Sequence, residues 1–431
     1  MNLPSSSRLK LGCIADDFTG ATDLANNLVR SGMRVVQTIG VPTTPLAADV
    51  DAVVVALKSR TVPKAEAIAQ SLAALKWLQA QGAEGRSPQI YFKYCSTFDS
   101  TPDGNIGPVT EALMNALDTD FTIATPAFPD NGRTVFKGYL FAGNVLLNES
   151  GMQNHPLTPM QDANLVRVMQ AQTQRKVGLI DYKTVAQGEA AIRERISALR
   201  TEGVGVAIVD ATSNADLLLL GPVLKDMPLI TAGSGVAIGL PTNFGLKPSL
   251  QASHLPAASG MQAVVSGSCS VATNAQVAHF KATGRPALAI DPASLMKGQS
   301  KAVVQQVLAW AAPLLKDGPV LVYSTAEPEA VKQVQAQLGV AEAGALVEHA
   351  LAAVSRGLVD LGVQQLVLAG GETSGACVQA LGIAQLQIGP QIDPGVPWCH
   401  SSSAAGGLHI ALKSGNFGSD DFFTKAFGAL Q

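Results

Sequence analysis

Charged and aromatic side chains are scarce in this chain of 431 residues. Lys, Arg, Asp and Glu make up only 15% of it, against about 25% in average soluble domains, and aromatic residues make up 5%. The 30 basic and 33 acidic side chains give a formal net charge of −3. Proteins that bind nucleic acid by neutralising phosphates need a basic excess, and single-strand binders need aromatic stacking platforms. The composition therefore predicts no nucleic-acid partner.

Cysteines and long apolar runs are scarce as well. The five cysteines lie far apart with no C-x-x-C pair, which argues against a disulfide framework or a zinc cage, and the six histidines show no metal-ligand spacing. The longest stretch without Asp, Glu, Lys or Arg, Pro248 to Phe280, contains prolines, histidines and amides that lipid could not satisfy. The N-terminus lacks the basic start and apolar run of a signal peptide. We expect a cytoplasmic protein with no membrane partner.

What the chain does contain is an alternation of short Val- and Ile-rich runs with longer amphipathic stretches, such as the helix predicted at 64–81. This order is typical of βαβ units around a mainly parallel sheet. Residues 132–148 alternate apolar and polar residues around two glycines, which indicates an antiparallel excursion. Strands are predicted at 9–15, 34–39, 52–57, 89–94, 121–125, 176–180, 205–209 and 228–232, then at 263–266, 287–290, 320–323 and 365–368.

Between Leu240 and Gly260 this alternation gives way to Pro, Gly, Ser and Asn. We therefore predict two α/β domains, 1–245 and 246–431, each with a mainly parallel sheet. In the second domain, we expect the parallel strands to be followed by a glycine-rich, antiparallel end. Interfaces between domains are favoured ligand sites, so a substrate cleft is expected between the two.

Asp16 and Asp17 follow the first predicted strand and precede a helix predicted at 22–31. The carboxyl ends of parallel strands are where open α/β sheets bind ligands. One carboxylate could accept a proton from a substrate hydroxyl, while the other orients that hydroxyl or approaches a metal. Asp17 could equally serve as the helix N-cap, and for Thr19 capping is the favoured interpretation.

Two further polar segments follow strands of the first half. The segment Lys93–Gly107 is rich in hydroxyl, amide and acid groups and exceeds the usual ~2–6 residues of a βα loop, so it suits a polyhydroxylated ligand. Its alternative is an ordinary loop with Ser and Thr turns. Arg133, after a Pro-Asp-Asn-Gly turn, could clamp a carboxylate through two parallel hydrogen bonds, although a lone surface arginine is the commoner finding.

The second half carries glycine turns suited to phosphate. Ser266–Ser270 and Ala369–Gly375 each follow an apolar strand and open a helix, and Leu412–Gly418 adds a third turn with a cation. Glycines let backbone N–H groups approach an anion, and a helix N-terminus attracts phosphate. A nucleotide is therefore expected in this half, although the third turn could simply precede the last helix.

Two familiar nucleotide motifs do not apply. Gly233–Gly239 has one residue too many for a dinucleotide fingerprint, and no Asp or Glu lies between Asp226 and Asp291 to bind a ribose. A nicotinamide dehydrogenase is thereby disfavoured. The Walker A pattern is absent, so any use of a nucleoside triphosphate is not of the P-loop kind.

Taken in order, these segments resemble the four-carbon acid sugar kinases over essentially the whole chain. Six blocks carry the resemblance: Asp16–Ala21, Lys93–Asn105, Pro129–Gly138, Ser266–Ser268, Gly370–Thr373 and Lys413–Gly418. The family implies an N-terminal domain that holds the sugar acid and a C-terminal domain that holds ATP.

The second block also bears on the substrate. In the threonate and erythronate branches it usually reads Asp-Ser-Thr-Leu-Arg-Gly-Asn, whereas here Pro102 and Asp103 replace the Leu-Arg pair. This variant resembles the branch that phosphorylates the 4-hydroxyl of 3-oxo-tetronate, a four-carbon keto sugar acid. A D-threonate or D-erythronate 4-kinase, and a non-catalytic sensor of a sugar acid or nucleotide, are the alternatives.

The resulting hypothesis assigns a role to each group. Asp17 is the base for the 4-hydroxyl and Asp16 orients it or a metal-bound water. The sugar acid is bound by Lys93, Ser100, Thr101, Asn105 and Arg133. ATP is bound by Ser266, Ser268, Gly370, Gly371, Glu372, Thr373, Lys413 and Gly415. Mg²⁺ is expected with ATP although no protein-only metal cage is visible, and a homodimer is possible.

Overall fold

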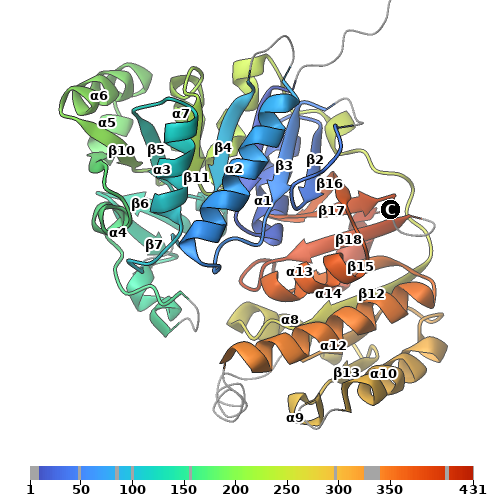
Figure 1. Ribbon diagram of the computed structural model, residues 1–431. Helices are drawn as coiled ribbons and strands as arrows, with labels where there is room; N and C mark the ends of the chain where they lie inside the picture. Colours follow the sequence, from blue (N-terminus) through green and yellow to red (C-terminus); the bar gives the residue numbers. More distant parts are fainter. Residues whose placement is uncertain are drawn as a thin grey trace, which may run out of the picture. The chain divides into compact units, whose positions relative to one another are not determined.

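The Val- and Ile-rich runs become strands of two α/β units in a computed structural model that describes residues 9–46, 50–82, 87–98, 101–154, 158–295, 299–324, 340–402 and 407–430. The units are Met1–Ser253 and His254–Gln431 (Figure 1). The division between them lies inside the Pro- and Gly-rich stretch in which the sequence analysis places its boundary.

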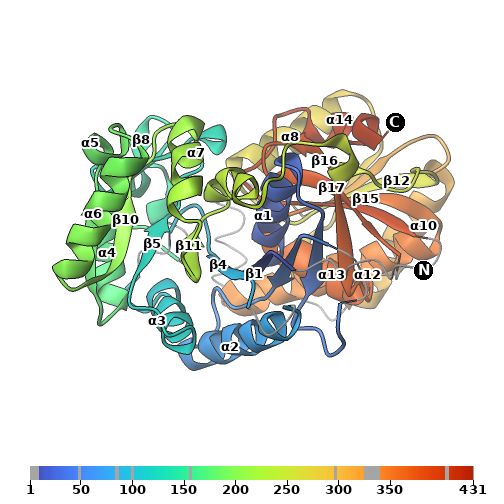
Figure 2. The ribbon, with the colours of Figure 1, turned by 90° about the horizontal axis from the view of Figure 1, so that it is seen from above.

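The first unit is built on a parallel sheet with the strand order β2-β3-β1-β4-β11-β5-β10-β9. All the strands predicted for this half are confirmed. Figure 2 shows α1 and α7 on one face of the sheet and α2 and α3 on the other, so its central strands are buried on both sides and mainly apolar. The strands are β1 Leu11–Ala15, β2 Val35–Ile39, β3 Ala52–Ala56, β4 Gln89–Lys93, β5 Thr122–Thr125, β9 Lys176–Ile180, β10 Val204–Val209 and β11 Leu229–Ala232.

The helices of this unit mostly begin at capping residues. The first begins at Phe18 rather than at the predicted Thr22, because Asp17 caps it one residue after Asp16. Ser213 and Asp216 form a reciprocal capping box at the start of α7. The helices are α1 Phe18–Arg30, α2 Lys64–Ala80, α3 Ile106–Ala116, α4 Leu165–Gln172, α5 Tyr182–Val185, α6 Glu189–Thr201 and α7 Asn214–Val223.

The predicted antiparallel excursion is a separate sheet of β6 Arg133–Phe136, β7 Tyr139–Ala142 and β8 Val145–Leu146. Lys137 and Gly138 join its first two strands with φ of 51° and 76°, as a tight two-residue hairpin turn requires. The carboxylate of Asp210 accepts both N–H groups of this turn, at 2.5 and 2.8 Å. This contact attaches the small sheet to the end of β10.

The second unit has the strand order β13-β14-β12-β15-β18-β17-β16, with β17 and β16 antiparallel to their neighbours. The four predicted strands and the antiparallel end are confirmed. Trp398 is fully buried in its core and donates its indole N–H to the Ala426 carbonyl at 2.8 Å. The strands are β12 Met261–Ser266, β13 Ala287–Ala289, β14 Val320–Tyr323, β15 Val363–Ala369, β16 Gln385–Asp393, β17 Val396–Ser401 and β18 Leu408–Lys413, and the helices are α8 Val271–Ala282, α9 Pro292–Ser294, α10 Ser300–Leu314, α12 Val340–Asp360, α13 Gly371–Ala380 and α14 Phe422–Lys425.

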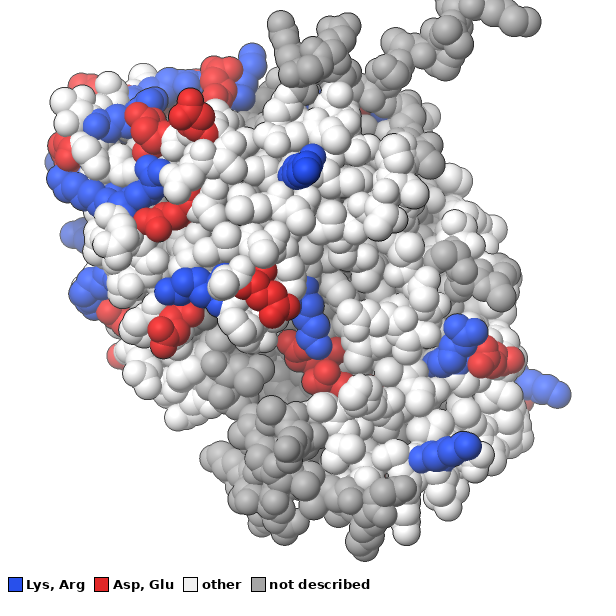
Figure 3. Space-filling model, in the orientation of Figure 1, with Lys and Arg blue, Asp and Glu red and all other residues white. Residues whose placement is uncertain are grey.

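Basic and acidic groups alternate over the region of α6 in the first unit, and large parts of the rest of the visible surface carry neither (Figure 3). Arginines of α6 form three ion pairs at 2.7 to 2.8 Å: Arg193–Glu189, Arg195–Glu202 and Arg200–Asp120. Exposed pairs of this kind contribute little to stability because water screens them. Among the helices that the structure describes, none is long and apolar enough to cross a membrane.

Candidate active site

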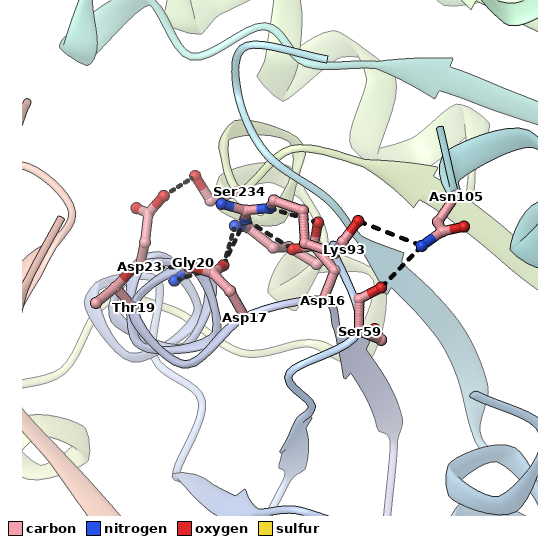
Figure 4. Close-up of polar contacts among 10 residues, drawn as sticks. Asp16, Asp17, Thr19, Gly20, Asp23, Ser59, Lys93, Asn105 and Ser234 are labelled. Atoms are coloured by element: carbon pink, nitrogen blue, oxygen red, sulfur yellow. Dashed lines mark hydrogen bonds and ion pairs between the residues drawn. The ribbon is translucent and has the colours of Figure 1, made fainter. Parts of the chain in front are cut away.

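Asp16 and Asp17 stand at the carboxyl end of β1, between that buried strand and α1 (Figure 4). Asp17 is the N-cap of α1: its Oδ1 accepts the Gly20 N–H at 3.0 Å and its Oδ2 accepts the Thr19 hydroxyl at 2.8 Å. The prediction of an N-cap is thus right for Asp17 and wrong for Thr19. The hydroxyl of Thr19 instead donates a hydrogen bond to the capping carboxylate of Asp17. Asp17 keeps a partly exposed carboxylate, with 19% of its side chain accessible, so capping does not prevent a role in chemistry.

Arg60 joins the two carboxylates, and the sequence analysis missed it. Its Nε and Nη2 contact the two oxygens of Asp16, both at 2.9 Å, and Nη2 also lies 2.7 Å from Oδ1 of Asp17. Arg60 follows β3, which pairs with β1 in parallel, so both segments emerge at the same edge of the sheet. The available signal was its position after a predicted strand, but only the strand order shows that this strand neighbours β1.

Lys93 approaches the pair from the other side, as the last residue of β4. Its Nζ lies 3.6 Å from Oδ1 of Asp17, and its side chain is 4% exposed. The ammonium passes directly over the first turn of α1, where a Cβ on Gly20 would lie only 1.8 Å from it. Only glycine at position 20 leaves room for this contact.

Partly exposed Asp17 and buried Asp23 differ strongly in pKa. Burial raises the pKa of Asp17, but the opposing charges of Arg60 and Lys93, together with the hydrogen bonds from Thr19 and Gly20, hold it at about 2. Burial raises the pKa of Asp23, on α1, to about 7. Ser234 donates to Oδ2 of Asp23 at 2.5 Å, so the turn that imitates a dinucleotide fingerprint in the sequence serves to hold this acid.

Replacing Asp23 by Asn should change stability in a pH-dependent way. Because folding raises the pKa of Asp23 from 3.8 to about 7, the folded protein retains its proton and loses stability as the pH rises between these values. The Asn variant lacks this loss, so its stability relative to wild type should increase by up to about 4 kcal/mol from pH 4 to pH 8. Thermal unfolding at both pH values measures this difference.

Asp51 offers a control for that experiment, because folding lowers its pKa instead of raising it. Despite burial, its ion pairs with Arg34 and Lys10 lower its pKa to about 2, so Asp51→Asn should destabilise the protein at both pH values. A stability difference between Asp23→Asn and wild type that is equal at pH 4 and pH 8 would contradict the assignment.

The polar loop before α3 is tied to its surroundings by two amide side chains. Asn105 donates Nδ2 to the carbonyls of Ser59, Arg60 and Val62 at 3.0, 3.2 and 2.9 Å. Gln172 donates to the Thr101 carbonyl and accepts the N–H of Gly107, both at 3.0 Å. Of the other predicted residues here, Thr101 is partly exposed, and Ser100 lies outside the described residues. Asn105 thus faces the chain that carries Arg60.

Arg133 is the first residue of β6 and lies beside the turn that precedes it. Its Nη1 donates to the Asn131 carbonyl at 3.1 Å, while burial lowers the pKa of its guanidinium. Its Nε and the Nδ2 of Asn131 are both buried and make no hydrogen bond. Two buried donors without acceptors on one turn suit an anionic ligand.

In the second unit the three predicted glycine turns lie together. Ser270 caps α8, and its Oγ donates to the Gly415 carbonyl at 2.5 Å. A Cβ on Gly415 would lie 2.5 Å from Oγ of Ser268, and one on Gly370 would lie 3.2 Å from the Ser268 backbone nitrogen. Ser266, Gly371 and Thr373 belong to the same group of turns, and Glu372 is exposed on the first turn of α13.

The side chain of Lys413 contacts these turns from within the core of the second unit. It is fully buried, and its Nζ lies 3.0 Å from each of Thr273 Oγ1, the Ser414 carbonyl and the Gly415 carbonyl. Burial lowers its pKa to about 7. These contacts direct the ammonium at loop oxygens, so its first effect is to hold the turn that contains Gly415.

Similarity to known proteins covers both units. A family of sugar-binding N-terminal domains matches residues 11–240, and a family of nucleotide-binding C-terminal domains matches residues 263–423. Proteins named 3-oxo-tetronate kinase from Burkholderia multivorans and Pseudomonas fluorescens are each 59% identical to this chain, over 99% of it and 98% of their own length.

Solved structures agree with this similarity. A crystal structure from Salmonella typhimurium LT2, described provisionally as a tRNA synthase, has a TM-score of 0.84 at 46% identity and covers 97% of this chain and 98% of its own. A Haemophilus influenzae protein has a TM-score of 0.75 at 45% identity and covers 97% and 100%. With a sugar-binding domain followed by a nucleotide-binding domain and full-length relatives of this kind, the chain belongs to the four-carbon acid sugar kinase family.

Proposed function

We propose that the protein transfers a phosphoryl group from ATP to the 4-hydroxyl of 3-oxo-tetronate and releases 3-oxo-tetronate 4-phosphate and ADP. The observation that carries this proposal is the Asp16–Asp17 pair at the end of β1, held by Arg60 and Lys93. The full-length relatives at 59% identity, which are named for this reaction, support the choice of substrate.

Asp17 is the proposed base and Asp16 the residue that keeps it in place through Arg60. Because the pKa of Asp17 is about 2, its carboxylate is ionised at physiological pH. Phosphoryl transfer passes through a loose transition state that needs positioning more than a strong base, and the hydroxyl becomes acidic as its oxygen bonds to phosphorus. A carboxylate of low basicity can therefore accept that proton late in the reaction.

The carboxylate of the sugar acid is proposed to bind the donors that the structure leaves without acceptors, Nε of Arg133 and Nδ2 of Asn131. Lys93 would support it with positive charge, and Ser100 and Thr101 would contact hydroxyl or keto oxygens. In the second unit, the turns around Ser268, Gly370 and Gly415 would bind the phosphates of ATP through backbone N–H groups and hydroxyls.

Mg²⁺ is proposed to arrive with ATP. Within the described ranges no group of three or more His, Cys, Asp or Glu could hold a metal, but Mg²⁺ commonly uses only one or two carboxylates together with substrate phosphates. When bound, the ion would neutralise phosphate charge. The cleft between the domains, the cytoplasmic location and a homodimer stay predictions.

A pair of variants should separate the two binding functions. Arg133→Ala removes the proposed carboxylate donor and should raise the KM for the sugar acid about 10- to 100-fold, leaving the KM for ATP within a factor of about three. Gly415→Ala places a Cβ against Ser268 and should do the reverse. Steady-state kinetics with each substrate varied in turn measures both effects. An Arg133→Ala variant that instead weakens ATP use would reassign this arginine.

The reaction itself is tested by ADP release over a panel of four-carbon acids in the presence of ATP and Mg²⁺. We expect the highest kcat/KM with a 3-oxo-tetronate. A preference for D-threonate or D-erythronate would move the protein to another branch of the family. Absence of ADP formation with every acid, despite binding, would indicate a sensor and reject the proposal.

A further inference from the structure

Asn105 is oriented away from the helix that it precedes. It occupies the N-cap position of α3, yet its side chain makes no capping hydrogen bond. Instead its Nδ2 is directed at three carbonyls of the Ser59–Val62 segment, at 2.9 to 3.2 Å. The residue is only 8% exposed, so the amide has little access to water that could replace these contacts. Its geometry is that of a clamp on the segment that carries Arg60.

The opposite side of that segment is fixed as well. The N–H groups of Ser59 and Arg60 donate to the Asp16 carbonyl at 3.0 and 3.2 Å. Figure 4 shows Asn105 on the far side of Ser59 from Asp17. The backbone at Ser59 and Arg60 is therefore held between the end of β1 and Asn105, while the guanidinium of Arg60 reaches back to both carboxylates.

Asn105 is in turn held by the loop on which it lies. Gln172, which is 7% exposed at the end of α4, bonds the loop on both sides of Asn105, at the Thr101 carbonyl and the Gly107 N–H. A Cβ on Gly107 would lie 2.5 Å from the Cβ of Gln172, so the two backbones are packed closely at this point. Contacts thus continue from α4, through Asn105, to Arg60.

We propose that Asn105 is a positioning residue that acts through Arg60, with Gln172 as its support, rather than a direct ligand of the sugar acid. The inference rests on the proposed function for its kinetic readout. Arg60 has three contacts of 2.7 to 2.9 Å to the oxygens of Asp16 and Asp17, and such charge-assisted bonds weaken steeply when their geometry is lost. Holding the backbone of Arg60 from behind is what keeps these contacts short.

This role predicts an effect that a substrate contact would not have. The charged groups that face Asp17 are Arg60 and Lys93, with Asp23 on its own helix and Asp16 across Arg60. Burial is the largest influence on the Asp17 carboxyl and raises its pKa. If Arg60 moves away, one of the charges that lower the pKa of Asp17 is weakened, so this pKa should rise. Removing an uncharged ligand of the sugar acid that contacts neither Asp17 nor Arg60 would leave the pKa of Asp17 unchanged.

The test compares Asn105→Ala with wild type in two ways. First, the ¹³Cγ signal of Asp17, identified by its loss in Asp17→Asn, is titrated in the free enzyme, where no turnover is needed. We expect its pKa to rise by at least 1 unit. Second, kcat and the KM for each substrate are measured at pH 7. We expect kcat to fall about 10- to 100-fold and the KM for the sugar acid to change less than about threefold.

Further variants keep the test decisive. If Asn105→Ala does not fold, Gln172→Ala takes its place in the test. It should show the same changes in the pKa of Asp17 and in kcat, with smaller amplitude. Arg60→Lys combined with Asn105→Ala should cost less than the sum of the single effects, because both act on one contact. Asn243→Ala is the matched control: its amide also donates to a backbone carbonyl, that of Gly221 at 2.7 Å, but outside the site.

The outcomes are distinct from failure of the proposed function. A rise in KM for the sugar acid, with no shift in the pKa of Asp17 and kcat near wild type, would overturn the inference and make Asn105 a substrate ligand. Full additivity of Arg60→Lys and Asn105→Ala would also overturn it. Wild type that releases no ADP with any acid would reject the kinase, while the titration of Asp17 would still decide the role of Asn105.

Discussion

Asp17→Asn should lower kcat by about 10²- to 10⁴-fold, the range that removal of a general base produces. Asn has the same size and can still accept the Gly20 N–H, so the start of α1 is kept. What is lost is the negative charge beside Arg60 and Lys93 and the ability to take the hydroxyl proton. Steady-state kinetics measures the effect, with the KM for both substrates recorded to separate binding from chemistry.

The chain offers a matched control for this variant. Asp181 caps α5 with the same two kinds of contact, from the N–H and the hydroxyl of Thr184, at 3.1 and 2.9 Å. Asp181→Asn should therefore change the capping contacts of α5 in the way that Asp17→Asn changes those of α1, and it should leave kcat near wild type. A kcat of Asp17→Asn within about threefold of wild type would show that Asp17 is a cap and not the base.

The same substitution should also affect stability, with a sign set by the pKa. Because folding lowers the pKa of Asp17 from 3.8 to about 2, its ion pairs stabilise the protein above pH 4, and this contribution is lost as the pH falls through 2. It amounts to about 2 kcal/mol at neutral pH. The Asn variant should thus unfold at a somewhat lower temperature. Kinetic assays should be run well below that temperature, so that unfolding does not contribute to the loss of kcat.

Gly20→Ala should reduce kcat/KM by about 10²-fold while the protein stays folded. The added Cβ would lie 1.8 Å from Nζ of Lys93 and 2.2 Å from Oδ1 of Asp17, so both groups must move. A displacement of about 1 Å at reacting groups can cost this much. Alanine is otherwise a better helix former than glycine by about 1 kcal/mol, so the loss falls on the site and not on α1.

Gly344→Ala provides the comparison for Gly20→Ala. Gly344 is also helical, in α12, but the nearest atom to an added Cβ is 3.8 Å away. Activity of this variant should equal wild type, and its stability should be equal or higher. Normal kcat/KM in Gly20→Ala, with thermal unfolding unchanged, would show that the reaction does not depend on where Lys93 places its ammonium.

Much of the architecture is determined by the sequence itself. The Val- and Ile-rich runs predict the strands because burial on both faces of a parallel sheet demands continuous apolar residues, a local property. The acid pair after β1 and the glycine turns after β12 and β15 follow from the same order, since ligand-binding residues gather at the carboxyl ends of strands. The family resemblance was visible in these short motifs alone.

Only the tertiary structure decided which of these residues meet. Arg60 carries no motif, and it belongs to the site because β3 pairs with β1, a neighbourhood that strand order sets and local sequence does not. Lys413 and Asn105 were assigned to ligands by position, yet their side chains are directed at backbone carbonyls of other segments. Local periodicity fixes where an element lies along the chain, whereas the partner of a buried polar group depends on which segments the sheet brings side by side.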